Sequence, residues 1–159
     1  MTVEGVQQMT VSFRRQHDVL INAPAEAIYD FLSNPNFRPL WRTASGMVEA
    51  ADRPLVRGEK FREEWRLRRG IVPLDWIVLD DERPNSWTIR ADTEIVGPIV
   101  VRYCLLPEGD ATRIIHHVTN PRRPTRPSLE QIQSIDEEIV AGLAAIKREV
   151  EDRLRTQAA

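Results

Sequence analysis

Glu63 is the residue whose chemical type fits its expected surroundings least. It shares the inward face of an expected β-strand with Phe61, Trp65 and Leu67. Burying a carboxylate costs several kcal/mol unless the group is paired or protonated. The position therefore suits a ligand anchor or a general acid or base. Two structural alternatives stay open: a buried pair with Arg15, or a register slip that leaves Glu63 in water.

The histidines are the second set of candidates for proton transfer. His116 has the strand phase of its apolar neighbours and is expected to face inward, whereas His117 is expected to face outward. An inward histidine can exchange a proton near neutral pH, or it can be a hydrogen-bonded core residue. His17 also has an inward phase. Cys104, the one cysteine, excludes a disulfide framework and has no activating partner in the sequence.

The sequence has none of the motifs that many cofactor- and metal-dependent enzymes share. It contains no glycine-rich dinucleotide loop, no phosphate-binding loop, no nucleophile-elbow serine and no HExxH. With three histidines and one cysteine, the sequence has few potential ligands for a zinc site. We therefore expect neither a cofactor nor a metal. A balance of 22 basic against 24 acidic residues argues against a nucleic-acid partner.

The composition is that of one soluble globular domain. The chain has 159 residues, of which 42% are hydrophobic and 29% charged. No apolar run approaches the roughly 18 residues of a membrane span. Residues 1–11 are polar and aperiodic and predict a loose N-terminal leader, followed by a single ligand-binding domain over residues 12–155. The first residues lack the pattern of a secretory signal, so a cytoplasmic location is expected.

The elements that must position these residues follow from periodicity. Alternation up to Ile21 predicts a strand, and Pro24 begins a short helix that ends at Asn34. A second helical turn precedes Gly46, where the period changes to two. Short connections make the following strands antiparallel neighbours. Turn-forming residues divide them into six segments, at about 46–51, 58–68, 71–80, 86–95, 98–107 and 111–119.

The last segment predicts one long helix from Ser128 to about Arg155. Ser128 and Gln131 have the spacing of a capping box. Apolar residues then recur every three or four positions and form one stripe. At 1.5 Å per residue the helix is about 40 Å long, enough to cross a sheet. The residues expected to face the sheet are Ile135, Ile139 and Leu143.

Several segments resemble those of the SRPBCC superfamily. The stretch Val19–Phe31 resembles its typical first strand and first helix, and Asn36–Trp41 resembles the aromatic end of its second helix. The segments Trp76–Val78 and Asp110–Ile114 are also similar to segments of that superfamily. Over residues 12–155, the order of strand, two short helices, six antiparallel strands and long helix resembles the helix-grip fold. The superfamily includes START-type lipid-transfer domains, birch-pollen allergens and polyketide cyclase/dehydrase-like proteins.

The resemblance implies an α+β helix-grip fold with an apolar cavity between a curved antiparallel sheet of about seven strands and the C-terminal helix. We expect Trp65, Trp76, Trp87 and Tyr103 to form one continuous cavity wall, although each aromatic residue alone is equally compatible with core packing. The residues expected to bind the ligand are Phe37, Trp41, Phe61, Glu63, Trp65, Trp76, Trp87, Tyr103, His116, Ile135, Ile139 and Leu143.

Three functions are compatible with such a fold. The first is a carrier or sensor of a small apolar molecule of lipid, polyketide or aromatic type. The second is an enzyme that resembles polyketide cyclases and dehydratases, with Glu63 and His116 as candidates for moving protons. The third is a partner-binding module similar to the chaperone activators of the superfamily, which an exposed apolar patch without a cavity would favour. The sequence is compatible with a monomer or a homodimer.

Overall fold

The strands follow the period-two pattern of the sequence. The computed structural model describes residues 9–158, so residues 1–8 of the predicted leader lie outside the described residues. The expected strands are all present, with ends that differ from the expected ones by a few residues. They are β1 (Val11–Ile21), β2 (Ser45–Glu49), β3 (Lys60–Leu67), β4 (Gly70–Glu82), β5 (Ser86–Thr93), β6 (Gly97–Glu108) and β7 (Ala111–Arg123).

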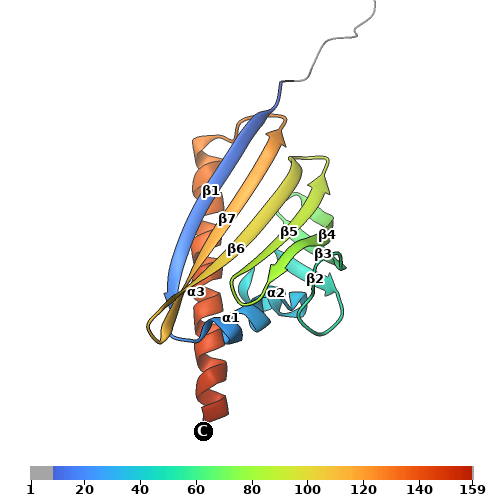
Figure 1. Ribbon diagram of the computed structural model, residues 1–159. Coiled ribbons are helices and arrows are strands. Elements are labelled where there is room, and N and C mark those ends of the chain that lie inside the picture. The colour runs from blue at the N-terminus through green and yellow to red at the C-terminus, as the bar shows by residue number, and fades with distance from the viewer. Residues whose placement is uncertain (1–8, 159) are drawn as a thin grey trace, which may run out of the picture.

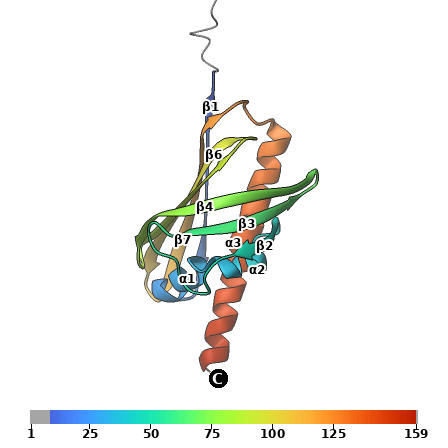
Figure 2. The ribbon, with the colours of Figure 1, turned by 90° about the vertical axis from the view of Figure 1, so that its right-hand side faces the viewer.

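The seven strands form one antiparallel sheet in the order β1-β7-β6-β5-β4-β3-β2. β1 and β2 therefore lie at opposite edges, although they follow one another in the chain (Figure 1). Figure 2 shows β3 and β4 running across the direction of β1. This strong curvature follows from the right-handed twist that accumulates from strand to strand. It gives the sheet a concave face.

Short helices fill the crossing from β1 to β2. They are α1 (Ala25–Leu32), the 3-10 turn η1 (Pro35–Phe37) and α2 (Arg38–Trp41). Pro24 precedes α1, where its missing N–H is not needed. The side chain of Asn34 accepts a hydrogen bond from the backbone N–H of Asn36 at 3.1 Å and so starts the 3-10 turn. α2 is thereby held against the concave face.

The long helix α3 (Leu129–Ala158) packs against β1, α1 and α2. Its predicted capping box is confirmed: the Ser128 N–H donates to Gln131 Oε1 at 2.8 Å, and the Gln131 N–H donates to Ser128 Oγ at 3.1 Å. The helix continues unbroken through Gly142. A Cβ at Gly142 would lie 3.3 Å from the carbonyl oxygen of Trp41, so glycine allows α2 and α3 to approach closely. The helix-grip α+β fold is confirmed.

Aromatic residues fill much of the space under the middle of the sheet. The ring of Phe61 stacks between those of Trp76 and Trp87, with centroids 6.1 and 6.4 Å away. Trp87 also contacts Tyr103 at 6.2 Å. Side chains in such contact exclude water and stabilise the fold chiefly by apolar burial. Within residues 9–158, no helix is long and apolar enough to cross a membrane.

Candidate functional site

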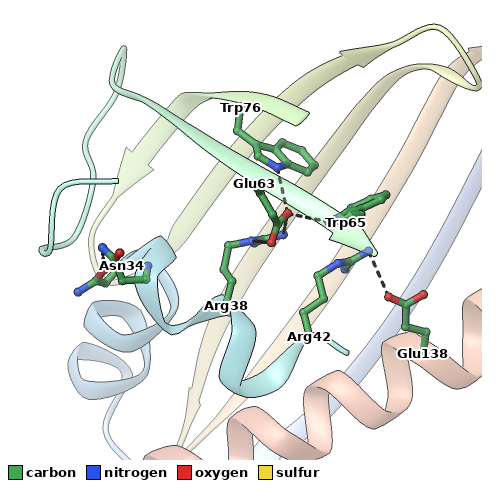
Figure 3. A network of polar contacts seen from close by, with 8 residues as sticks. Asn34, Arg38, Arg42, Glu63, Trp65, Trp76 and Glu138 are labelled. Atoms are coloured by element: carbon green, nitrogen blue, oxygen red, sulfur yellow. Dashed lines mark hydrogen bonds and ion pairs between the residues drawn. The ribbon is translucent and has the colours of Figure 1, made fainter. Parts of the chain in front are cut away.

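Glu63 forms a buried ion pair with Arg38 of α2 (Figure 3). Arg38 Nε donates to Glu63 Oε2 at 2.8 Å and Arg38 Nη2 donates to Oε1 at 3.2 Å. Neither residue is more than 1% exposed, which excludes the register slip that would place Glu63 in water. The alternative pair with Arg15 is wrong, because both carboxylate oxygens of Asp136 bind Arg15 instead.

The indole groups of two tryptophans complete the surroundings of Glu63. Trp65 Nε1 and Trp76 Nε1 donate to Glu63 Oε1 at 2.7 and 3.1 Å. The guanidinium carbon of Arg38 lies 5.2 to 5.7 Å from the ring centroids of Trp41, Phe61 and Trp76. The two buried charges are thus compensated by each other, by hydrogen bonds and by aromatic faces.

This pairing determines the protonation state of Glu63. Burial raises the pKa of the carboxyl, but the charge and hydrogen bonds of Arg38 outweigh burial and lower the pKa to about 2. The carboxyl is therefore ionised throughout the physiological range. It holds α2 on the sheet as a fixed anion, and it has no proton to give.

A cavity of about 190 Å³ lies beside this ion pair, between the sheet and the N-terminal half of α3. Its surface is mostly apolar. Side chains from β1, β3, β6, β7 and α3 surround it, together with Arg42 at the end of α2 and Val96 of the β5–β6 turn. Besides Val96, the lining residues are Phe13, Arg42, Trp65, Ile99, Val101, His116, Val118, Asn120, Arg123, Ile135, Glu138 and Ile139.

Arg42 places a charge in this apolar cavity. Its guanidinium carbon lies 4.4 Å from the ring centroid of Trp65. Arg42 Nη2 lies 3.5 Å from Glu138 Oε1 of α3 (Figure 3). The Nε–H of Arg42 is buried and has no hydrogen-bond partner among the residues that the structure describes. An unpaired buried donor of this kind is a ready contact for an oxygen atom of a ligand.

His116 contributes the other polar wall of the cavity. It is buried as its strand phase predicts, and its ring meets the ring of Tyr103 edge-on at 5.2 Å. Nδ1 finds no hydrogen-bond partner within residues 9–158. Burial, followed by the positive charge of Arg42, lowers the pKa of His116 to about 3. The imidazole is therefore neutral near pH 7. His117 takes no part in the lining.

The structure separates the predicted ligand-binding residues into four groups. Trp65, His116, Ile135 and Ile139 line the cavity. Trp41 and Leu143 line a narrow extension of about 10 Å³ that shares Arg42 with it. Phe37 lies elsewhere, in an open surface groove of about 550 Å³ between α1 and the end of α3. The remaining residues are part of the packed interior beside the cavity: Phe61, Glu63, Trp76, Trp87 and Tyr103.

Two details differ from the sequence analysis. Of the four aromatic residues expected to form one wall, only Trp65 is among the cavity-lining residues that the structure describes. Leu67 was expected inward, but 44% of its surface is exposed. The reason is that the neighbouring β2 ends its pairing at Trp65, so the concave face does not extend to Leu67.

The most important residues that sequence reasoning missed are arginines. Arg38 and Arg42 lie four positions apart, a spacing that places both on one side of a helical turn. Asn120 shares the strand phase of His116 and could also have been found. Glu138 and Arg123 give no such signal. Within residues 9–158, no group of three His, Cys, Asp or Glu side chains is placed to hold a metal ion.

Comparisons with solved structures agree with this architecture. An aromatase/cyclase from a Streptomyces species is 17% identical, and the match covers 91% of this chain and 96% of that chain with a TM-score of 0.72. The protein Ara h 8.0201 is 10% identical over 89% of this chain and 99% of its own, with a TM-score of 0.69. A norcoclaurine synthase mutant from Thalictrum flavum, in complex with a transition-state analogue, is 16% identical over 92% and 99%, with a TM-score of 0.65.

Sequence comparison identifies the family. No curated protein matches the chain. A family profile does match, and it covers residues 10–151, from the start of β1 to the last third of α3. The matched region contains every strand and every residue that lines the cavity. The chain therefore belongs to the family described as polyketide cyclase / dehydrase and lipid transport.

Proposed function

We propose that the protein binds a small aromatic molecule that carries a carbonyl or anionic oxygen. The observation that supports this proposal is the cavity of about 190 Å³ with its buried, unsatisfied Arg42 Nε–H. An apolar cavity of about 150 Å³ is large enough for benzene. The space beside Trp65 therefore suits one substituted ring. A larger polycyclic ligand would require the cavity to widen.

The polar groups favour an acceptor on the ligand. The charged lining residues are Arg42, Arg123 and Glu138, so the lining carries one net positive charge, and Asn120 adds an amide. A ligand oxygen near Arg42 would satisfy a donor that is now unpaired, which gains the energy of a charge-assisted hydrogen bond. His116 is neutral near pH 7 and adds no charge to this wall of the cavity.

Binding is favoured over catalysis by the state of the two candidate acid–base groups. His116, with a pKa of about 3, is a weak base near pH 7. Glu63, with a pKa of about 2, is paired with Arg38 and does not line the cavity. General acid–base catalysis is most efficient when the pKa lies near the working pH. A cyclase or dehydratase activity remains the second candidate, because of the family to which the chain belongs.

Titration with cinnamate, measured by isothermal titration calorimetry, tests the proposal. Ile135→Trp fills the cavity and is expected to weaken binding at least tenfold. Val140→Trp adds the same side chain at an exposed position of α3 and is expected to leave binding unchanged. Equal binding by both variants, with unchanged circular dichroism, would refute the location of the site.

The charge of Arg42 is tested with a matched pair of ligands. Arg42→Gln removes the cation and keeps a hydrogen-bond donor. We expect cinnamate to bind this variant about tenfold more weakly, since a hydrogen bond from a charged donor contributes roughly 1.4 kcal/mol more than one from a neutral donor. The affinity for methyl cinnamate, which carries no charge, should fall much less in this variant. An equal loss for both ligands would contradict the assigned role.

A further inference from the structure

Three surface segments adjoin the cavity. They are the β3–β4 turn (66–71), the β5–β6 turn (93–97) and the connection from β7 to α3 (121–130), each taken with its flanking residues. Trp65, Val96 and Arg123 lie in or directly beside these segments, and all three line the cavity. We call the three segments the mouth rim. Figure 2 shows all of them toward the end of the molecule at which α3 begins.

The mouth rim concentrates positive charge in a chain that is acidic overall. It contains Arg66, Arg68, Arg69, Arg122, Arg123 and Arg126 against Glu94 and Glu130, a balance of +4 in a chain of formal charge −2. The rest of the molecule therefore carries −6. Such a division of charge orients a protein toward an anionic surface.

The arginines of the mouth rim have no ion-pair partner among the described residues, although Arg123 donates a hydrogen bond to the carbonyl oxygen of Thr125. Elsewhere on the surface, Arg53, Arg83 and Arg113 each bind a carboxylate, whereas Arg57 and Arg148 form no ion pair with the described residues. Among the described residues, no carboxylate lies within ion-pair distance of the six rim arginines. Arg68 and Arg69 form the two-residue turn between the paired residues Leu67 and Gly70 and are exposed.

Exposed aliphatic side chains stand beside these cations. Leu67, Ile71 and Ile95 are 44%, 61% and 65% exposed. The β3–β4 tip projects beyond the sheet, because β2 pairs only as far as Trp65 and β5 only as far as Trp76. Figure 2 shows this tip extending past α3. Exposed aliphatic residues that gather at one projecting tip mark a candidate site for contact with another apolar phase.

The geometry of the tip distinguishes between possible partners. Leu67 is paired with Gly70, so Ile71, the next residue, points to the opposite face of the hairpin. A rigid protein surface would cover one of these faces, whereas lipid surrounds an inserted tip on both. Nucleic acid would bind the arginines but would leave the aliphatic side chains in water. A bilayer with anionic headgroups satisfies both groups of residues.

We propose that the mouth rim docks on anionic lipid bilayers, with Leu67 and Ile71 inserted between the headgroups and the arginines bound to phosphates. In this orientation the opening of the cavity faces the membrane. A ligand that dissolves in the bilayer then passes between bilayer and cavity without crossing water. This docking surface goes beyond the ligand-binding proposal and does not depend on the identity of the ligand.

Vesicle sedimentation tests the proposal with the whole chain. The protein is expected to bind vesicles of phosphatidylcholine and phosphatidylglycerol in equal parts, and to bind vesicles of pure phosphatidylcholine much more weakly. High salt should release it, because exposed charges are screened. Failure to bind the anionic vesicles, or equal binding to both kinds, would overturn the proposal and would point to a protein or nucleic-acid partner instead.

Matched variants locate the surface. Arg68→Ala with Arg69→Ala should lower the partition coefficient about 30-fold, at roughly fivefold for each cation near the surface. Leu67→Ser with Ile71→Ser should lower the partition coefficient to a similar extent. About half of each aliphatic side chain is exposed, and the variant loses the insertion of this apolar surface into the bilayer. The control, Arg57→Ala with Arg148→Ala, removes two exposed arginines away from the mouth rim and should have little effect.

Cinnamate titration of the same variants separates the two proposals. Arg68, Arg69, Leu67 and Ile71 do not line the cavity, so their variants should bind cinnamate as the unchanged protein does. If the control pair weakens vesicle binding as much as the Arg68 and Arg69 pair, attraction depends on net charge alone and the assigned surface is wrong.

Discussion

Replacement of Glu63 by glutamine should destabilise the protein strongly while changing its shape very little. The glutamine amide oxygen can still accept a hydrogen bond from Trp65 Nε1. It cannot neutralise Arg38, which is 1% exposed and remains charged because guanidinium does not deprotonate in proteins. Removing one partner of a buried ion pair costs about 3–5 kcal/mol.

Urea unfolding followed by far-ultraviolet circular dichroism measures this loss. With an m-value of about 2 kcal/mol/M, a loss of about 4 kcal/mol lowers the unfolding midpoint by about 2 M. The double variant Arg38→Met with Glu63→Gln leaves no charge unpaired. It should therefore be more stable than Glu63→Gln alone.

The matched control is Asp30→Asn. Asp30 binds Arg83 through both carboxylate oxygens at 2.8 and 2.9 Å, with the same bidentate geometry as the buried pair, but both side chains are about half exposed. Exposed ion pairs contribute little to stability. If Glu63→Gln lowers the midpoint no more than Asp30→Asn does, burial of the Arg38 charge does not determine its energetic role, and our reasoning fails.

Two further predictions concern pH and the start of α3. The pKa of His116 is about 3 in the folded protein and about 6.5 in the unfolded chain. Between these pH values the unfolded chain binds a proton at His116 and the folded protein does not. This residue therefore lowers the free energy of unfolding as the pH falls from about 6.5 toward 3. In urea unfolding measured at a series of pH values, His116→Phe should reduce the slope of the unfolding free energy against pH by up to about 1.4 kcal/mol per pH unit. An unchanged slope would contradict the lowered pKa. Ser128→Ala should lower the unfolding free energy by about 1 kcal/mol through loss of the capping box, whereas Ser134→Ala, within the same helix, should not lower it, and equal losses would show that the cap is not responsible.

The fold could be predicted because its signals are local. Strand alternation, turn residues and the apolar stripe of the last helix each depend on neighbours within a few residues. The same alternation placed Glu63 and His116 inward. The loss of phase at Leu67 could not be foreseen, because it depends on where β2 begins: its first residue, Ser45, pairs with Trp65.

The site was harder to predict because its contacts are not local. Arg38 reaches Glu63 only after the segment between β1 and β2 has crossed the concave face. Strand phase also identifies which aromatic residues face inward, but it does not show whether they meet a cavity or packed side chains. Trp76 and Trp87 face side chains that fill the interior, whereas Trp65 faces the cavity. That difference depends on the summed volumes of residues from several elements.

The pairing of β1 with β7 has a consequence for the protein as it emerges from the ribosome. β1 is synthesised before the other strands, but Val19 pairs with Ile114, in the last strand, and α3, which packs on β1, is made later still. Strands β2 to β6 can therefore pair with one another while β1 is still unpaired. An unpaired strand is prone to join another chain, and charged side chains reduce that risk. Arg14, Arg15 and Asp18 place charges on both faces of β1, which protects the nascent strand until its partner arrives.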